Sequence, residues 1–186
     1  MINFLKLTLV TAISVLFFTG CGSNEPTPQM QGKIYTQTNM WVEKNRHLTT
    51  NYQRGQLIPV NTEVKILDYS SKVVRFQVVS TKQVIQVVNN VRFTQLDSVG
   101  VFKRNFSKSK VNISKFSKLE KEAISQGIVK NGMSKDAVII ARGFPPVHVT
   151  PSLTQNQWKY WQNRFVTRNV LFQNDKVVGQ AGWGAR

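Results

Sequence analysis

Few side chains in this sequence have the types and spacing that catalysis or metal binding requires. The chain has one cysteine, Cys21, two histidines, His47 and His148, and nine acids. Neither histidine has a partner at the spacing of a zinc site, no G-x-S-x-G motif marks a catalytic serine, and no phosphate-binding glycine loop occurs. Glu120 and Glu122 lie two residues apart, so on a helix they point to different faces. We therefore expect a protein that is not an enzyme and that holds no metal and no cofactor.

The cysteine has another use, because it ends a secretory signal. The run from Leu7 to Phe18 is apolar apart from three hydroxyl side chains and follows a head that carries Lys6. It is too short for a stable transmembrane span. The tetrapeptide Phe18-Thr19-Gly20-Cys21 resembles a lipobox, at which bacterial lipoproteins are acylated on the thiol and cleaved before it. We expect residues 1–20 to be a lipoprotein signal peptide and Cys21 to be the site of lipid attachment.

Two or more acyl chains on Cys21 would give stable anchoring, which a single short chain does not. Lipidation also accounts for the only thiol of a secreted chain. An ordinary cleaved signal or an amino-terminal anchor helix are the alternatives. Gly22 and Ser23 follow the cysteine in place of Asp, and this resembles the signal for the outer membrane of Gram-negative bacteria. We expect a protein lipid-anchored to the periplasmic face of the cell outer membrane.

The positive charge of the chain, +16 in total, is concentrated between residues 103 and 121. This stretch contains a single acid, Glu120, against the basic residues Lys103, Arg104, Lys108, Lys110, Lys115, Lys118 and Lys121. In a secreted protein such a patch attracts phospholipid head groups, lipopolysaccharide or acidic cell wall, and nucleic acid is in the wrong compartment. We expect the first six of these residues to face anions or the membrane. The alternative is a solvated basic surface without a ligand.

The mature chain divides into four segments by composition. Residues 21–32 are polar with two prolines, which predicts a lipidated tether that would span about 35 Å when extended. Residues 33–98 hold short alternating runs, such as 63–68, 73–78 and 84–88, separated by turn residues. They predict a small antiparallel β-barrel. Residues 99–115 form the basic junction, and residues 116–186 a second domain.

Residues 51–64 of the first module carry a local resemblance. The sequence NYQRGQLIPVNTEV resembles the turn and strand of bacterial Src-homology-3-like modules, with Asn61 in place of the usual glycine. Such modules often bind cell wall or peptides through exposed aromatics, and the resemblance implies this role for Tyr35, Trp41 and Tyr52. The alternative is that these aromatics belong to the core.

The second domain reads as two helices followed by three strands. Ser117 and Glu120 fit a capping box for a helix that ends at Gly127, and Ser134 caps a second helix that ends before Gly143. Strands follow at 158–161, 164–172 and 176–181, with a tight turn at 174–175. Two helices on one face of an antiparallel meander make an α+β unit, so the fold class is mainly β plus α+β.

This second domain resembles a known family. The blocks GMSKDAV (132–138), GFP (143–145), WKY (158–160) and VLFQNDKV (170–177) resemble, in order and spacing, those of the SmpA/OmlA (BamE-like) outer membrane lipoproteins. The resemblance implies a non-catalytic accessory of outer-membrane β-barrel protein assembly that contacts other lipoproteins and anionic phospholipid. The first module is an insertion relative to that family.

Strand alternation places Trp158 and Tyr160 on one face and Trp161 on the other. A surface Trp close to Arg164 is a composition typical of binding hot spots, so Trp161 and Arg164 are candidate partner-binding residues, although the amino-terminal module could instead cover Trp161. We expect an envelope scaffold that binds a protein partner. A cell-wall or peptide-binding lipoprotein is the alternative, and an enzyme inhibitor is suggested by fold analogy alone.

Overall fold

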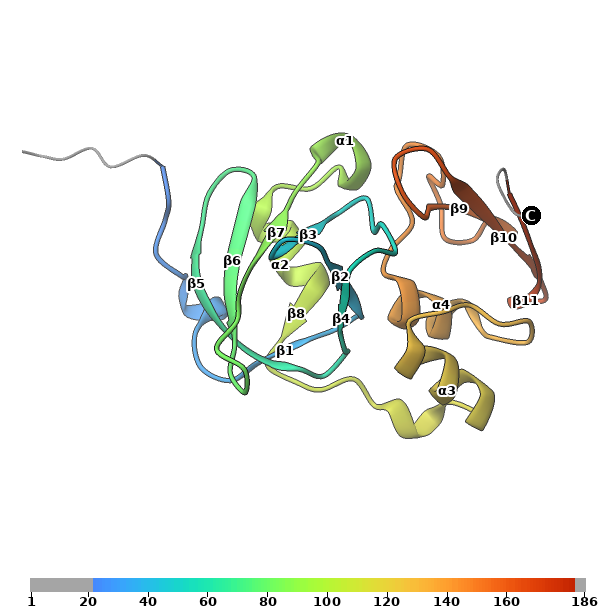
Figure 1. The fold of residues 1–186 in the computed structure, drawn as a ribbon, viewed down its shortest axis with the longest axis horizontal. Helices are drawn as coiled ribbons and strands as arrows, with labels where there is room; N and C mark the ends of the chain where they lie inside the picture. Colours follow the sequence, from blue (N-terminus) through green and yellow to red (C-terminus); the bar gives the residue numbers. More distant parts are fainter. Residues whose placement is uncertain (1–21, 183–186) are drawn as a thin grey trace, which may run out of the picture.

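The computed structural model describes residues 22–182, which form a mixed α/β structure made mostly of strands. A curled six-stranded sheet occupies one end of the long axis and a three-stranded antiparallel sheet occupies the other (Figure 1). Two helices, α3 and α4, lie on the inner side of the smaller sheet. The proposed signal peptide and Cys21 lie outside the described residues.

The six-stranded sheet has the order β3-β7-β6-β5-β1-β8. Its strands are β1 (Ile34–Thr36), β3 (Arg46–Leu48), β5 (Glu63–Tyr69), β6 (Val73–Val78), β7 (Val84–Val88) and β8 (Phe106–Ser107). The strands β2 (Met40–Val42) and β4 (Gln56–Ile58) form a separate ribbon. The alternating runs at 63–68, 73–78 and 84–88 are confirmed as strands whose apolar residues are buried.

The sheet is an open half-barrel, so the expected closed antiparallel barrel is only partly correct. Lys44 and Asn45 both have positive φ angles and reverse the chain after β2. As a result β3 enters the sheet parallel to β7, while β2 stays outside and pairs with β4. Helix α2 (Ser98–Asn105) contributes Val101 and Phe102 to the core enclosed by the curl. Helix α2 therefore covers part of the core, which in a closed barrel would be surrounded by paired strands alone.

Two segments differ from the sequence-based expectation because they belong to the first core. Residues 24–30, expected within a free tether, dock on the sheet: the Asn24 and Tyr69 backbones exchange two hydrogen bonds, and Met30 of the 3-10 helix η1 (Pro28–Met30) is buried. Residues 99–105, expected in the basic junction, are helical, and a short helix α1 (Val91–Thr94) precedes them. The polar composition of the first segment concealed the buried Met30, and the basic composition of the second concealed Val101 and Phe102.

The carboxy-terminal elements follow the predicted order. They are α3 (Lys118–Gln126), α4 (Lys135–Arg142), β9 (Gln157–Trp161), β10 (Thr167–Gln173) and β11 (Lys176–Ala181), after a 3-10 turn η2 (Ile113–Lys115). The capping box of α3 and the left-handed end at Gly127 are confirmed. Asn174 and Asp175 both have positive φ, as the predicted tight turn requires. The largest difference is in β10, which begins at Thr167 and not at 164.

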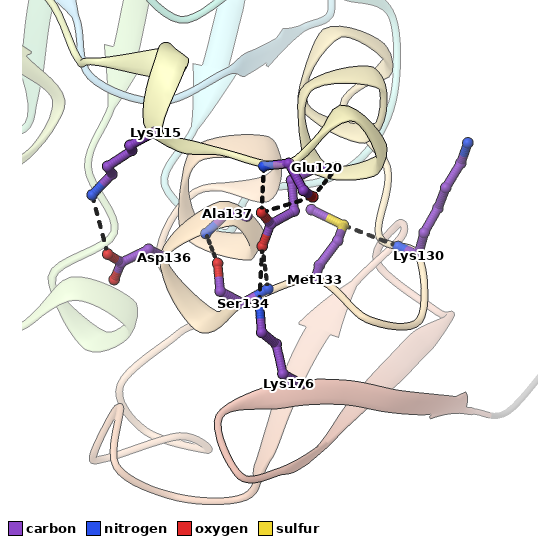
Figure 2. A network of polar contacts seen from close by, with 9 residues as sticks. Lys115, Glu120, Lys130, Met133, Ser134, Asp136, Ala137 and Lys176 are labelled. Carbon is purple, nitrogen blue, oxygen red and sulfur yellow. Dashed lines mark hydrogen bonds and ion pairs between the residues drawn. The ribbon is translucent and has the colours of Figure 1, made fainter.

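Glu120 joins the two helices of this half (Figure 2). Its Oε2 accepts hydrogen bonds from the backbone N–H and hydroxyl of Ser117, and its Oε1 accepts one from the Ser134 N–H at 2.8 Å. The Lys176 ammonium lies 3.5 Å from the same Oε1. Burial alone would raise the pKa of this carboxyl, but the hydrogen bonds from Ser134 and Ser117 outweigh it and lower the pKa to about 2.

Asn39, which follows β1, joins the two halves of the molecule. Its side chain is 2 % exposed and donates to the carbonyls of Ile124 in α3 and Ala141 in α4. Its Oδ1 accepts from the Val60 N–H at 2.8 Å. The last carbonyls of a helix lack partners within the helix, so one amide satisfies the ends of two helices. Both halves are therefore held in one arrangement.

Candidate functional site

The most exposed large apolar side chain of the described residues lies in the loop that joins β9 to β10. Phe165 is 78 % exposed, and the Arg164 guanidinium lies 4.7 Å from the centre of its ring. The loop is ordered by Asn163, whose Oδ1 accepts from the N–H groups of Phe165 at 2.8 Å and Val166 at 3.0 Å. An aromatic ring and a guanidinium are thus held at the surface by a fixed backbone, which is a composition favoured at protein interfaces.

Trp161, at the base of this loop, is half-buried and has neighbours from both halves. Its ring stacks on His148 at 5.5 Å and meets the edge of Phe93 of α1 at 6.0 Å. The Val147 N–H donates to the Phe93 carbonyl at 2.8 Å, which fixes α1 against the second half. The predicted opposite orientation of Trp161 and Tyr160 is confirmed, since Tyr160 is buried in the core. Much of the Trp161 ring is packed at the interface between the two halves.

The candidates Tyr52 and Trp41 also lie where the two halves meet. The N–H of Gln53, the residue after Tyr52, donates to the carbonyl of Gln162, the residue after Trp161, at 3.2 Å. This places half-buried Tyr52 next to the β9–β10 loop. Trp41 packs against the end of α3, where a Cβ added to Gly127 would lie 3.1 Å from the indole. Trp41 is therefore part of the interface between the halves.

The six basic candidates do not form one uniform surface. Arg104 turns inward: its guanidinium lies 4.9 Å from the Phe144 ring, and burial lowers its pKa. Lys115 pairs with Asp136 at 3.4 Å. The remaining four are exposed, and in residues 22–182 none lies within 4.0 Å of a carboxylate: Lys103, Lys108, Lys110 and Lys118. Lys108, Lys110 and Lys118 lie along the stretch of chain that leads from β8 to the start of α3.

The histidines have structural surroundings. His47 is buried, with its Nδ1 3.1 Å from the Trp41 carbonyl, and burial lowers its pKa. Burial and the nearby Arg92 lower the pKa of His148. Within the part of the chain that the structure describes, no three His, Cys, Asp or Glu side chains cluster in a way that could hold a metal. Over the same residues, no helix is long and apolar enough to span a bilayer.

Sequence reasoning missed Phe165 as a surface residue because it placed the residue inside a strand. Asn163-Arg164 was the available signal, since Asn side chains often accept hydrogen bonds from the backbone two residues on and so stop a strand. It also missed Arg142 and Arg168, which line a pocket between the halves together with Gln53 and Gln162.

The chain matches no protein-family model, no curated protein and no solved structure. The resemblances to the SmpA/OmlA family and to Src-homology-3-like modules therefore remain predictions that rest on the residues quoted for them.

Proposed function

We propose that this protein is a non-catalytic envelope scaffold, lipid-anchored at Cys21 to the periplasmic face of the outer membrane, that binds a protein partner through the β9–β10 loop. The observation that carries the proposal is the exposed Phe165 with Arg164 over its ring, on a loop whose backbone is hydrogen-bonded in place. An aromatic ring beside an arginine is a combination enriched at protein interfaces and their hot spots.

The short link between Cys21 and the folded part supports a defined orientation. Asn24 is already hydrogen-bonded to Tyr69, so only Gly22 and Ser23 separate the lipidated residue from the sheet. Two residues span about 7 Å. The six-stranded sheet would thus lie next to the membrane. The second half, at the opposite end of the long axis in Figure 1, would point away from the membrane toward a partner in the periplasm.

The partner class comes from the resemblance of residues 132–177 to the SmpA/OmlA (BamE-like) family, which includes a component of β-barrel protein assembly. The order of two helices and a three-stranded meander agrees with that proposal. The curled sheet with α2 in its core is a departure from a simple Src-homology-3-like module, so a role specific to this chain is part of the proposal.

A crosslinking experiment tests the function. A photoreactive amino acid at position 165 in the lipidated full chain, expressed in its own membranes, should crosslink to one defined envelope protein, and Phe165→Ala should abolish co-purification of that protein. A photoreactive residue at Val178, which is 50 % exposed on β11, is the control and should give no such product. Equal crosslinking from both positions, or none from 165, contradicts the proposed site. Recovery of proteins unrelated to β-barrel assembly would contradict the partner class.

The alternative function is binding of cell wall or peptide by the first half. The observation that favours it is Tyr35 on β1, which is only half-buried and has the exposed Lys110 ammonium 5.1 Å from its ring. An aromatic ring next to a cation suits an acidic sugar polymer. Co-sedimentation of the full chain with purified sacculi, lost in Tyr35→Ala, would support this function. Equal sedimentation of both proteins would exclude Tyr35 from it.

A further inference from the structure

A pocket between the two halves contains two arginines and no acid. It is lined by Gln53 from the first half, and by Val129, Arg142, Tyr160, Gln162, Arg168, Val170 and Gln180 from the second. Its volume is about 20 Å³, where roughly 10 to 15 Å³ is enough for a water molecule. The pocket therefore has room for a small polar group.

Strand register explains why charged groups reach this interior position. Arg168 is paired with Tyr160 across β9 and β10, and Val170 is paired with Gln180 across β10 and β11. Paired residues, and residues two apart on one strand, point to the same face. Tyr160 and Val170 are buried on the face that α3 and α4 cover, so Arg168 also points toward the helices.

Arg142 enters the same space from the last turn of α4. Its side chain is 6 % exposed, and its guanidinium carbon lies 5.4 Å from the Tyr160 ring centre. Tyr160 is no counter-ion: its hydroxyl donates to the Gly143 carbonyl at 3.0 Å, and burial raises its pKa far above its ordinary value. Burial lowers the pKa of Arg142 to about 10, which still leaves it charged at neutral pH.

Neither arginine has an acidic partner within residues 22–182, which include all nine acids of the chain. Over those residues no carboxylate lies within 4.0 Å of either guanidinium, and neither guanidinium donates a hydrogen bond to a protein atom. A buried cation without a partner is costly, and Arg168 adds like-charge repulsion. An anion in the pocket would relieve both.

We propose that this pocket binds the carboxylate of a ligand between Arg142 and Arg168, with the Gln162 amide as a further donor. A carboxylate matches the planar fork of a guanidinium, and its two oxygens suit two arginines. The small volume favours a planar carboxylate over the larger tetrahedral phosphate. Because Gln53 and Gln162 line the pocket from different halves, the ligand would also bridge the two halves.

The test is anion binding by the full chain in an uncharged detergent. Acetate, titrated at constant ionic strength against chloride, should bind saturably by calorimetry and raise the melting temperature. Arg168→Gln should weaken acetate binding by at least tenfold. Arg142→Met, which keeps much of the buried length, should do the same and lose the acetate-dependent rise in melting temperature. Arg46→Gln, an exposed arginine on β3 outside the pocket, is the control and should bind as the wild type does.

Three outcomes would overturn the proposal. Acetate that stabilises wild type, Arg142→Met and Arg168→Gln equally acts through general ionic effects. Absence of saturable binding in a folded wild-type protein removes the site. Tighter binding of phosphate than of acetate contradicts the assignment to a carboxylate. Since Arg168 is only partly buried, Arg168→Gln keeps the test decisive even if Arg142→Met fails to fold.

Discussion

The Oε1 atom of Glu120 lies 2.8 Å from the backbone nitrogen of Ser134, so the carboxylate that caps α3 also binds the residue that caps α4. This one side chain sets the start of both helices that cover the small sheet. Because it is 5 % exposed, water cannot replace its partners.

Acid should weaken the fold through Glu120. Its folded-state pKa of about 2 lies below the ordinary value of 4.5, so its contribution is fully present above pH 4.5 and is lost as the pH falls toward 2. The difference corresponds to about 3 kcal/mol of unfolding free energy. Glu120→Gln should lower stability at pH 7 by a similar amount and flatten its dependence between pH 5 and 2. Urea unfolding at several pH values measures this.

The control for that experiment is Glu122→Gln on the same helix, because Glu122 is exposed and pairs with Lys130 at the surface. Its substitution should change the urea midpoint little at pH 7. If the two variants lose the same stability, the network around Glu120 is not the cause of the acid sensitivity.

Asn39→Ala should destabilise the junction of the two halves. The substitution leaves the Ala141 carbonyl and the Val60 N–H without partners and leaves the Ile124 carbonyl with the Gly127 N–H as its remaining donor. The expected loss is about 3 kcal/mol, as for several buried unsatisfied polar groups. Asn112→Ala is the control, since the exposed Asn112 caps only the short turn η2 and should cost about 1 kcal/mol or less. Similar urea midpoints for both variants would contradict the role of Asn39.

Two aromatics of the β9–β10 region should behave differently. Trp161→Ala removes contacts with Phe93 and His148 and should cost about 2 kcal/mol. Phe165→Ala removes an exposed ring and should change stability by about 0.5 kcal/mol or less. Thermal unfolding of both variants tests whether Trp161 stabilises the interface between the halves while Phe165 contributes little to stability. A large loss for Phe165→Ala would show that the ring packs against the protein.

Gly127→Ala should displace Trp41. At a φ of +65° an alanine is strained, and its Cβ would lie 3.0 Å from Leu57 and 3.1 Å from the Trp41 indole. The expected loss is about 2 kcal/mol together with a shift of the Trp41 indole N–H resonance. Gly132→Ala, also at positive φ but with no atom within 4 Å of the added Cβ, should lose stability without shifting that resonance. An unchanged Trp41 signal in Gly127→Ala would contradict the close contact.

Local patterns in the sequence were sufficient to predict those helices, turns and strands whose defining residues lie close together in the chain. Ser117, Glu120 and Gly127 define α3, and the Asn174-Asp175 turn defines the last hairpin, because capping and turn chemistry depend on adjacent backbone groups. The alternation of Val74, Phe76 and Val78 predicted β6 for a similar reason.

Features that depend on distant partners could not be predicted. Nothing near Asn39 indicates that its amide is buried between two helices. The basic residues Lys103 and Arg104, directly after Val101 and Phe102, concealed α2 in a stretch that seemed polar. Arg168 alternates with Val170 and Phe172, which indicates that its side chain points inward. That it shares a pocket with Arg142 depends on how α4 crosses the sheet. Trp161 was correctly placed opposite Tyr160, while its cover by α1 was one of two open possibilities.

The clamp formed by Asn39 also has a consequence for the order of folding. Its two carbonyl partners lie 85 and 102 residues further along the chain. A chain synthesised from its amino terminus therefore cannot satisfy this amide until more than three quarters of its length is available. Contacts of such long sequence separation slow folding. The strands of the first half should therefore remain incompletely locked until the last helix arrives, and a chaperone could bind the nascent chain during that interval.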